Sequence, residues 1–155
     1  AGVYLVKDIA TQTNGSWPRT ITPTQSYLYF TVEHPVFERE LWRTDGSAAG
    51  TLLLRDIHPT DSSDPMFLAE FGPYVYFVAA SETRTYFQYT LPGQEIWRTD
   101  GTPEGTVLVA DFGDWESVGF PSELTVMGNH IYCASDAYGW GDELWRTDGT
   151  PEGFE

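Results

Sequence analysis

Residues 95–112, EIWRTDGTPEGTVLVADF, decide how this chain folds, because nearly the same string occurs three times. Residues 40–57 read ELWRTDGSAAGTLLLRDI, and residues 143–153 read ELWRTDGTPEG. The apolar continuation of the first two copies recurs at residues 2–9, GVYLVKDI, ahead of all of them. A fixed period of this length is typical of repeat architectures. We therefore interpret the chain as three copies of one unit.

The sequence pattern of each unit predicts four short antiparallel strands. In residues 28–32, LYFTV, apolar side chains alternate with Tyr29 and Thr31, as in a packed strand. The ELWRT string forms the next strand, and an Asp-Gly turn leads to a Val- and Leu-rich fourth strand. Four strands per repeat describe a β-propeller blade, so we predict an all-β chain, a β-propeller of three four-stranded blades. The whole chain, 1–155, is one repeat domain with units at approximately 10–57, 58–112, and 113–155 plus 1–9.

Three blades are too few to close a propeller, which typically has about four to eight. The third ELWRT string has no fourth-strand sequence after it, whereas residues 2–9 supply one ahead of the first unit. We expect a homodimer that closes a six-bladed ring, in which residues 2–9 of each copy complete the last blade of the other. A fragment of a longer array of such units is the alternative.

Composition limits the partners of the chain. Its 155 residues include 23 Asp and Glu against eight Lys and Arg, a formal net charge of −15 at pH 7. Such a surface repels phosphate, so we expect no nucleic acid partner, and no apolar run is long enough for membrane insertion. The start at Ala1 and the glycosylation triplet at Asn14 favour a secreted, extracellular protein.

The repeats differ in length at two joints, between the second and third strands and between one unit and the next. Both joints emerge on the same side of a propeller, so one face is expected to vary. Flat aromatic rings beside Asp and Asn suit the C–H faces and hydroxyls of sugars. Plugging gaps between blades or forming the dimer interface is the alternative role. The predicted ligand-binding residues are the aromatics of these segments: Trp17, Tyr86, Phe87, Tyr89, Trp115, Tyr138 and Trp140.

Residues that recur identically in every unit indicate structure instead. The repeated tryptophans are expected to pack between neighbouring blades, and the repeated Arg and Asp residues to form structural hydrogen bonds near the Asp-Gly turn. Cys133 stands where the other units have Phe30 and Phe77, so a buried and unreactive thiol is expected. The sets are Trp42, Trp97 and Trp145; Arg43, Arg98 and Arg146; and Asp45, Asp100 and Asp148.

No signature of catalysis, of a metal or of a cofactor stands out. The chain lacks a nucleophile elbow and a phosphate-binding glycine loop, and Glu38 with Glu40 is a carboxylate pair expected by chance among 23 acids. The run at 61–64, DSSD, lacks the ligand spacing of a calcium loop. We therefore predict a non-enzymatic protein for carbohydrate recognition or adhesion. A carrier of an apolar small molecule, a lipid or pigment at blade junctions or the subunit interface, is the alternative.

The string ELWRTDGTPEGTVLVADF, with an LYF-like strand upstream, resembles the ELWxxDGTxxGT repeat family. The resemblance covers nearly the whole chain and implies propeller blades in a secreted or surface protein, with no catalytic residues to carry over. The second unit departs from the pattern, because residues 86–94, YFQYTLPGQ, stand where the family usually has a short Gly-rich loop.

Overall fold

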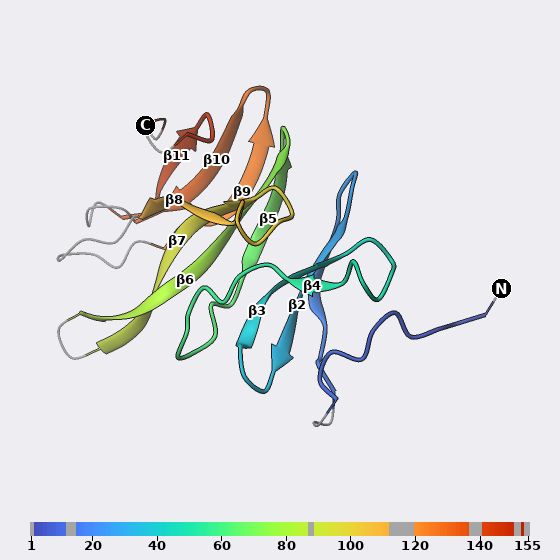
Figure 1. Cartoon of the computed structure of the whole chain (residues 1–155). Coiled ribbons are helices and arrows are strands. Elements are labelled where there is room, and N and C mark those ends of the chain that lie inside the picture. Colours follow the sequence, from blue (N-terminus) through green and yellow to red (C-terminus); the bar gives the residue numbers. More distant parts are fainter. Residues whose placement is uncertain are drawn as a thin grey trace.

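The computed structural model describes residues 2–11, 15–86, 89–111, 120–136, 141–150 and 153. These residues form eleven strands and no helix, arranged as three antiparallel sheets in chain order (Figure 1). The predicted all-β class is confirmed, with one small sheet for each sequence unit. No helix of the described residues is long and apolar enough to cross a membrane.

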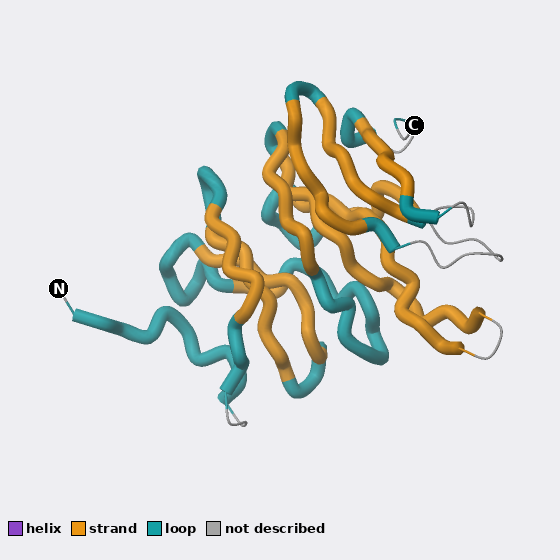
Figure 2. The backbone as a smooth tube through the Cα atoms, turned by 180° about the vertical axis from the view of Figure 1, so that it is seen from behind, coloured by secondary structure: helices purple, strands orange, loops and turns teal. Residues whose placement is uncertain are grey.

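Within each sheet, strands that are consecutive in the chain are neighbours. Sheet A contains β1 (Arg19–Pro23), β2 (Leu28–His34), β3 (Glu38–Thr44) and β4 (Leu52–Leu53). Sheet B contains β5 (Met66–Phe71), β6 (Tyr74–Tyr86), β7 (Tyr89–Thr99) and β8 (Val107–Asp111). Sheet C contains β9 (Ser122–Met127), β10 (His130–Ser135) and β11 (Glu143–Thr147). Figure 2 shows the same strands from behind.

The core lies between the sheets, and both faces of sheet B are covered. Phe77 and Trp97 pack with Leu41 and Leu54 of the first unit, whereas Tyr76 and Val78 pack with side chains of sheet C. Successive residues of β6 therefore point to opposite junctions, which makes residues 75–80 buried without a break. The predicted packing of Trp97 between neighbouring units is confirmed.

Cys133 belongs to the core between sheets B and C. It is a free cysteine with 3% of its surface exposed, and burial raises the pKa of its thiol to about 11. The expected burial of this thiol is confirmed, and the raised pKa disfavours formation of the thiolate at neutral pH.

The turn after the ELWRT strand has the same construction in each unit. In the second unit, Asp100 Oδ1 accepts hydrogen bonds from the backbone N–H and the hydroxyl of Thr102, at 2.8 and 2.7 Å. The hydroxyl bond is the main cause that holds the pKa of Asp100 below its usual value. Gly101 has φ +91°, which favours glycine, and a Cβ on Gly105 would overlap the Asp100 carboxylate. The repeated DG…G spacing is therefore a steric requirement of this turn.

The first strand of each unit contains a β-bulge that the sequence did not reveal. Its register shifts two residues after the repeated proline, and a residue other than glycine has a positive φ there. Bulges strengthen the local twist of a strand. The three residues share no chemical type, so no pattern marks the position: Thr20 (φ 50°), Phe67 (φ 54°) and Glu123 (φ 55°).

The second unit differs from the prediction in its longest variable segment. The segment was expected to be a loop, yet β6 and β7 continue as a hairpin until Tyr86 pairs with Tyr89. Alternating Thr83 and Thr85 favour this extension, because β-branched residues fit a pleated strand. The two tyrosines thus lie at the tip of a hairpin.

Candidate functional site

Segments from both variable joints meet at one end of sheets A and B. The Glu33 amide donates to the carbonyl of Ser16 at 2.8 Å, and the Arg39 amide donates to Ser62 Oγ at 3.2 Å. His58 Nε2 lies 3.1 Å from Thr83 Oγ1 of the long hairpin. We call residues 15–18, 33–38, 57–65 and 81–86 the loop face. These contacts hold the four segments together.

Trp17 presents the largest exposed ring of the loop face. Its surface is 58% exposed, and its φ of 44° directs the chain into Pro18. Asp64 precedes Pro65 in the second unit with φ 45°, and Phe120, 37% exposed, precedes Pro121 in the third. Each unit therefore places a different side chain at the same position of the repeat. Phe120 was not among the predicted residues, although its position before the proline marks it as the counterpart of Trp17.

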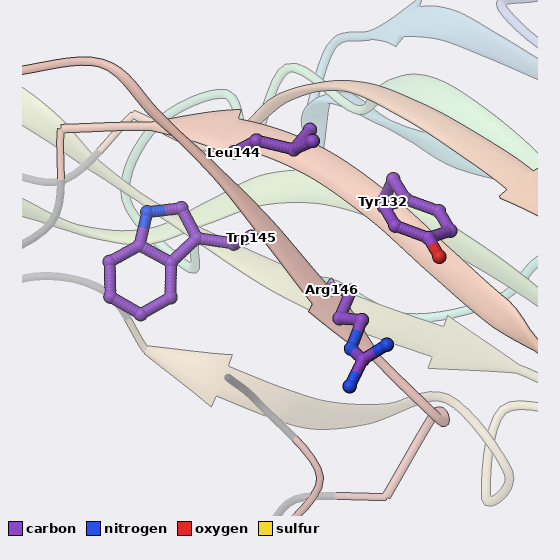
Figure 3. Close-up of a pocket in the computed structure, with 4 residues that line it drawn as sticks. All are labelled: Tyr132, Leu144, Trp145 and Arg146. Carbon is purple, nitrogen blue, oxygen red and sulfur yellow. The ribbon is translucent and has the colours of Figure 1, made fainter.

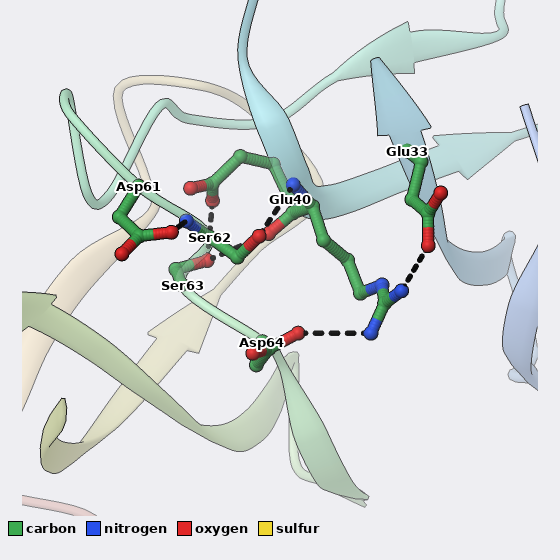
Figure 4. A network of polar contacts seen from close by, with 7 residues as sticks. Glu33, Glu40, Asp61, Ser62, Ser63 and Asp64 are labelled. Carbon is green, nitrogen blue, oxygen red and sulfur yellow. Dashed lines mark hydrogen bonds and ion pairs between the residues drawn. The ribbon is translucent and has the colours of Figure 1, made fainter. Parts of the chain in front are cut away.

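Arg39 forms ion pairs with two carboxylates of the loop face, Glu33 and Asp64, which are labelled in Figure 4. Its Nη1 lies 3.1 Å from Asp64 Oδ1, and its Nη2 forms a second ion pair with Glu33. About half of each carboxylate side chain is exposed, so these pairs add little stability. They fix where the two acceptors lie relative to each other.

The two aspartates of residues 61–64 have different partners within the protein. The Asp61 carboxylate accepts the amide of Ser62 at 2.8 Å, while Asp64 faces Arg39. No group of three or more potential ligand residues gathers around a common point in the described part of the chain. This acidic turn is held by backbone contacts, by Arg39 and by the hydrogen bond of Ser63 to Glu40.

Glu40 lies beneath the loop face and is fully buried. It accepts hydrogen bonds from Ser63 Oγ at 2.5 Å and from the His58 amide at 3.3 Å. Burial raises the pKa of Glu40 to about 7, opposed by these hydrogen bonds. The glutamate of the ELW string is thus an internal anchor for the connection to sheet B. The sequence alone had suggested a chance carboxylate.

His34 supplies a hydrogen-bonding group beside the first hairpin loop. Its Nδ1 accepts the amides of Val36 at 3.2 Å and Phe37 at 3.4 Å, and its ring stacks on Phe37 at a centroid distance of 4.7 Å. In the neutral ring, Nε2 therefore carries the proton and can donate to a ligand.

Most of the predicted ligand-binding residues cannot be placed on this face. Phe87, Trp115, Tyr138 and Trp140 lie outside the described residues, as do the side chains of Tyr86 and Tyr89. The described site therefore consists of Trp17 and the polar groups of the other loop-face segments.

A second concave feature lies on sheet C, away from the loop face. Tyr132, Leu144, Trp145 and Arg146 line a cavity of about 270 Å³ on strands β10 and β11 (Figure 3). Three of these residues come from the repeated string, and of their counterparts Leu41, Ile96 and Trp97 are packed at junctions between sheets.

Comparison with known proteins assigns no family. No protein-family model matches the chain, and no curated protein matches it. The resemblance to the ELWxxDGTxxGT repeats thus stays a prediction, and the function must be argued from the geometry.

Proposed function

We propose that this chain is a non-enzymatic, propeller-type binding module whose loop face recognises carbohydrate outside the cell. The observation that carries the proposal is the exposed Trp17, in a segment whose Ser16 carbonyl accepts the amide of Glu33. A flat ring in water suits the C–H face of a pyranose. The acidic surface favours a neutral or cationic sugar over a phosphorylated one.

The polar groups of the loop face can pair with the hydroxyls of a sugar. His34 Nε2 is a donor, and the free lone pairs of Glu33 and Asp64 are acceptors. Arg39 holds both carboxylates in place before a ligand arrives, which reduces the ordering cost of binding. A stacking ring with preset donors and acceptors is the chemistry that hydroxyl-rich ligands require.

Propeller architecture is the arrangement that best accommodates the three sheets. Sheets A and B have the four-strand order of a blade, sheet C has three strands in the same order, and sheet B is packed on both faces. In a propeller, the joints that vary would all lie on one side, so that neighbouring units would offer several subsites. Several weak subsites give useful avidity.

The cavity on sheet C favours a second candidate function. Its lining combines Tyr132, Leu144 and Trp145, which suits an apolar ring or chain. A carrier of a lipid or pigment would hold its ligand there. Solvent extraction of native protein, followed by absorbance and mass spectrometry, would reveal such a cargo.

A glycan array followed by calorimetry tests the carbohydrate proposal. Trp17→Ala should weaken binding at least about tenfold, because stacking is lost, whereas Trp17→Phe should keep part of it. Met127→Ala is the matched control, since Met127 is 63% exposed at the β9–β10 turn, away from the loop face. Equal affinities for Trp17→Ala and the control would contradict the proposal, as would the absence of any glycan ligand.

A further inference from the structure

The outer edge of β11 is open where the equivalent edges of β3 and β7 are covered. Strand β4 pairs with β3 and strand β8 pairs with β7, but no described strand pairs with that side of β11. The equivalent leucine and isoleucine positions show the consequence. Leu41 and Ile96 are fully buried, whereas Leu144 is 73% exposed.

A sequence like that of β4, which pairs with such an edge in sheet A, also occurs near the start of the chain, where its side chains are exposed. Tyr4 and Leu5 align with Leu52 and Leu53 of β4, and are 77% and 76% exposed. Exposed apolar residues in a strand-forming sequence mark a segment that is ready to pair.

Residues 7–9 already lie against sheet A as residues 55–57 lie against sheet B. Lys7 Nζ donates to the carbonyl of Thr51 at 2.6 Å, and its counterpart Arg55 donates to the carbonyl of Thr106 at 2.9 Å. Ile9 packs on the cluster of Phe30 and Trp42, in the way that Ile57 packs with their counterparts in sheet B. The opening segment therefore runs beside sheet A as the last strand of a preceding unit would. Figure 1 shows it far from β11 of its own chain.

The Asp-Gly turn of one unit also packs on the sheet of the preceding unit. Tyr76 Oη and Arg98 Nη1 both donate to the carbonyl of Gly149 at 3.1 Å, so the Asp-Gly turn of the third unit docks on sheet B. The turn of the second unit likewise lies against Tyr27 and Tyr29 of sheet A.

Among the described residues, no such neighbour lies against the first turn. Nothing lies within 4 Å of a Cβ built on Gly46. Tyr132 and Arg146, the counterparts of Tyr76 and Arg98, line the cavity on sheet C. The same molecule thus offers both the turn and the surface that would receive it.

We propose that the open edge of β11 binds a second copy of this chain, which adds its residues 4–7 as a fourth antiparallel strand of sheet C. The register follows sheets A and B, and places Leu5 opposite Trp145 and Tyr4 opposite Arg146. The Val6 amide donates to the Leu144 carbonyl, as the Leu54 amide donates to that of Leu41 at 3.1 Å. The Gly46 turn of the second copy packs on Tyr132. Two copies form this contact reciprocally and close a ring of six sheets.

Sedimentation equilibrium of the full chain tests the pairing. The wild type should show the mass of two copies at micromolar concentration, and Val6→Pro should raise the dissociation constant at least about tenfold by removing one ladder donor. Gly2→Pro is the control, since Gly2 lies outside the expected ladder and has open space where a side chain would begin. Circular dichroism of Val6→Pro should match that of the wild type. A wild type that stays monomeric, or dimers equally tight in Val6→Pro, would overturn the proposal.

Charge substitution at Tyr4 tests the register. Tyr4→Glu places a carboxylate opposite Arg146 and should give a tighter dimer than Tyr4→Arg, by roughly threefold or more. Net charge predicts the reverse order, because the chain carries −15 and an added cation would reduce repulsion between copies. Arg146→Glu combined with Tyr4→Arg should restore association. A tighter dimer for Tyr4→Arg alone would overturn this register.

Discussion

The outer edges of β7 and β11 carry nearly the same sequence and differ only in what lies beside them. Around β7, Ile96 is fully buried and Glu95 is 1% exposed; on β11, Leu144 is 73% exposed and Glu143 is exposed as well. Burial in this molecule is therefore a property of the junction between units. A unit of this kind cannot bury its two faces alone, which is the physical reason for repetition. A complete junction and the open edge should therefore respond differently to similar substitutions.

The largest loss of stability should come from removing a large side chain from the junction between sheets A and B. Phe77 is fully buried there, so Phe77→Ala should lower the free energy of unfolding by about 3–5 kcal/mol. Leu144→Ala on the open edge should cost less than about 0.5 kcal/mol in dilute solution. Urea titrations followed by circular dichroism measure both. Similar losses for the two variants would mean that β11 is already covered.

The buried glutamate gives the junction a dependence on pH. The pKa of Glu40 is raised by burial to about 7, so its folded form prefers the proton. Its contribution to stability is therefore fully present below about pH 4.5 and is lost as the pH rises through 7.

Glu40→Gln should remove this dependence of the free energy of unfolding on pH, and should raise that free energy at pH 8 by on the order of 2 kcal/mol. Glu143→Gln, at the exposed counterpart, controls for the chemical change, and the wild-type difference between pH 5 and pH 8 should survive it. Urea titrations at these two pH values supply the comparison. If the stability of Glu40→Gln depends on pH as strongly as that of the wild type, ionisation of Glu40 costs little stability in the folded protein.

The Asp-Gly turns of the first and second units differ in the same way, with smaller expected losses of stability. A Cβ at Gly105 or at Gly50 would overlap the carboxylate of its own turn. In the turn that contains Gly105, Gly101 lies close to Tyr27. In the turn that contains Gly50, open space lies beside Gly46. Gly105→Ala should thus cost about 1–3 kcal/mol, and Gly50→Ala less, because its turn can relax. Thermal unfolding compares the two, and equal costs would show that docking does not constrain the turn.

The smallest effect concerns one hydroxyl at the junction between sheets B and C. Tyr76→Phe removes the hydrogen bond to the Gly149 carbonyl and should cost about 1 kcal/mol. Tyr132→Phe, at the open counterpart, should leave dilute-solution stability unchanged. A loss of stability in Tyr132→Phe at low concentration would place a partner on that hydroxyl within the single chain.

The sequence predicted the repeated parts of this fold well because the same residues solve the same packing problem in each unit. Trp97 and the alternation in β6 followed from such repetition. The bulge at Thr20 escaped because its three counterparts differ in chemical type and share only a backbone angle. The anchoring role of Glu40 escaped because its partners, His58 and Ser63, lie in a segment whose length varies.

The candidate site was predictable only in outline. That both variable joints share one face followed from the order of the strands, and the contact between Glu33 and Ser16 agrees with it. The role of Arg39 was not predictable, because its two carboxylate partners come from different joints whose distance depends on the packing of sheets. Phe120 was missed because its position before a proline gained meaning only beside Trp17.

The most direct measurement is hydrogen exchange of residues 143–147 as a function of protein concentration. The open-edge account predicts that protection of this peptide rises as a second copy binds, while β3 and β7 stay protected throughout. Protection of β11 that is equally strong at the lowest concentration would contradict the account, because the edge would then be covered within a single chain.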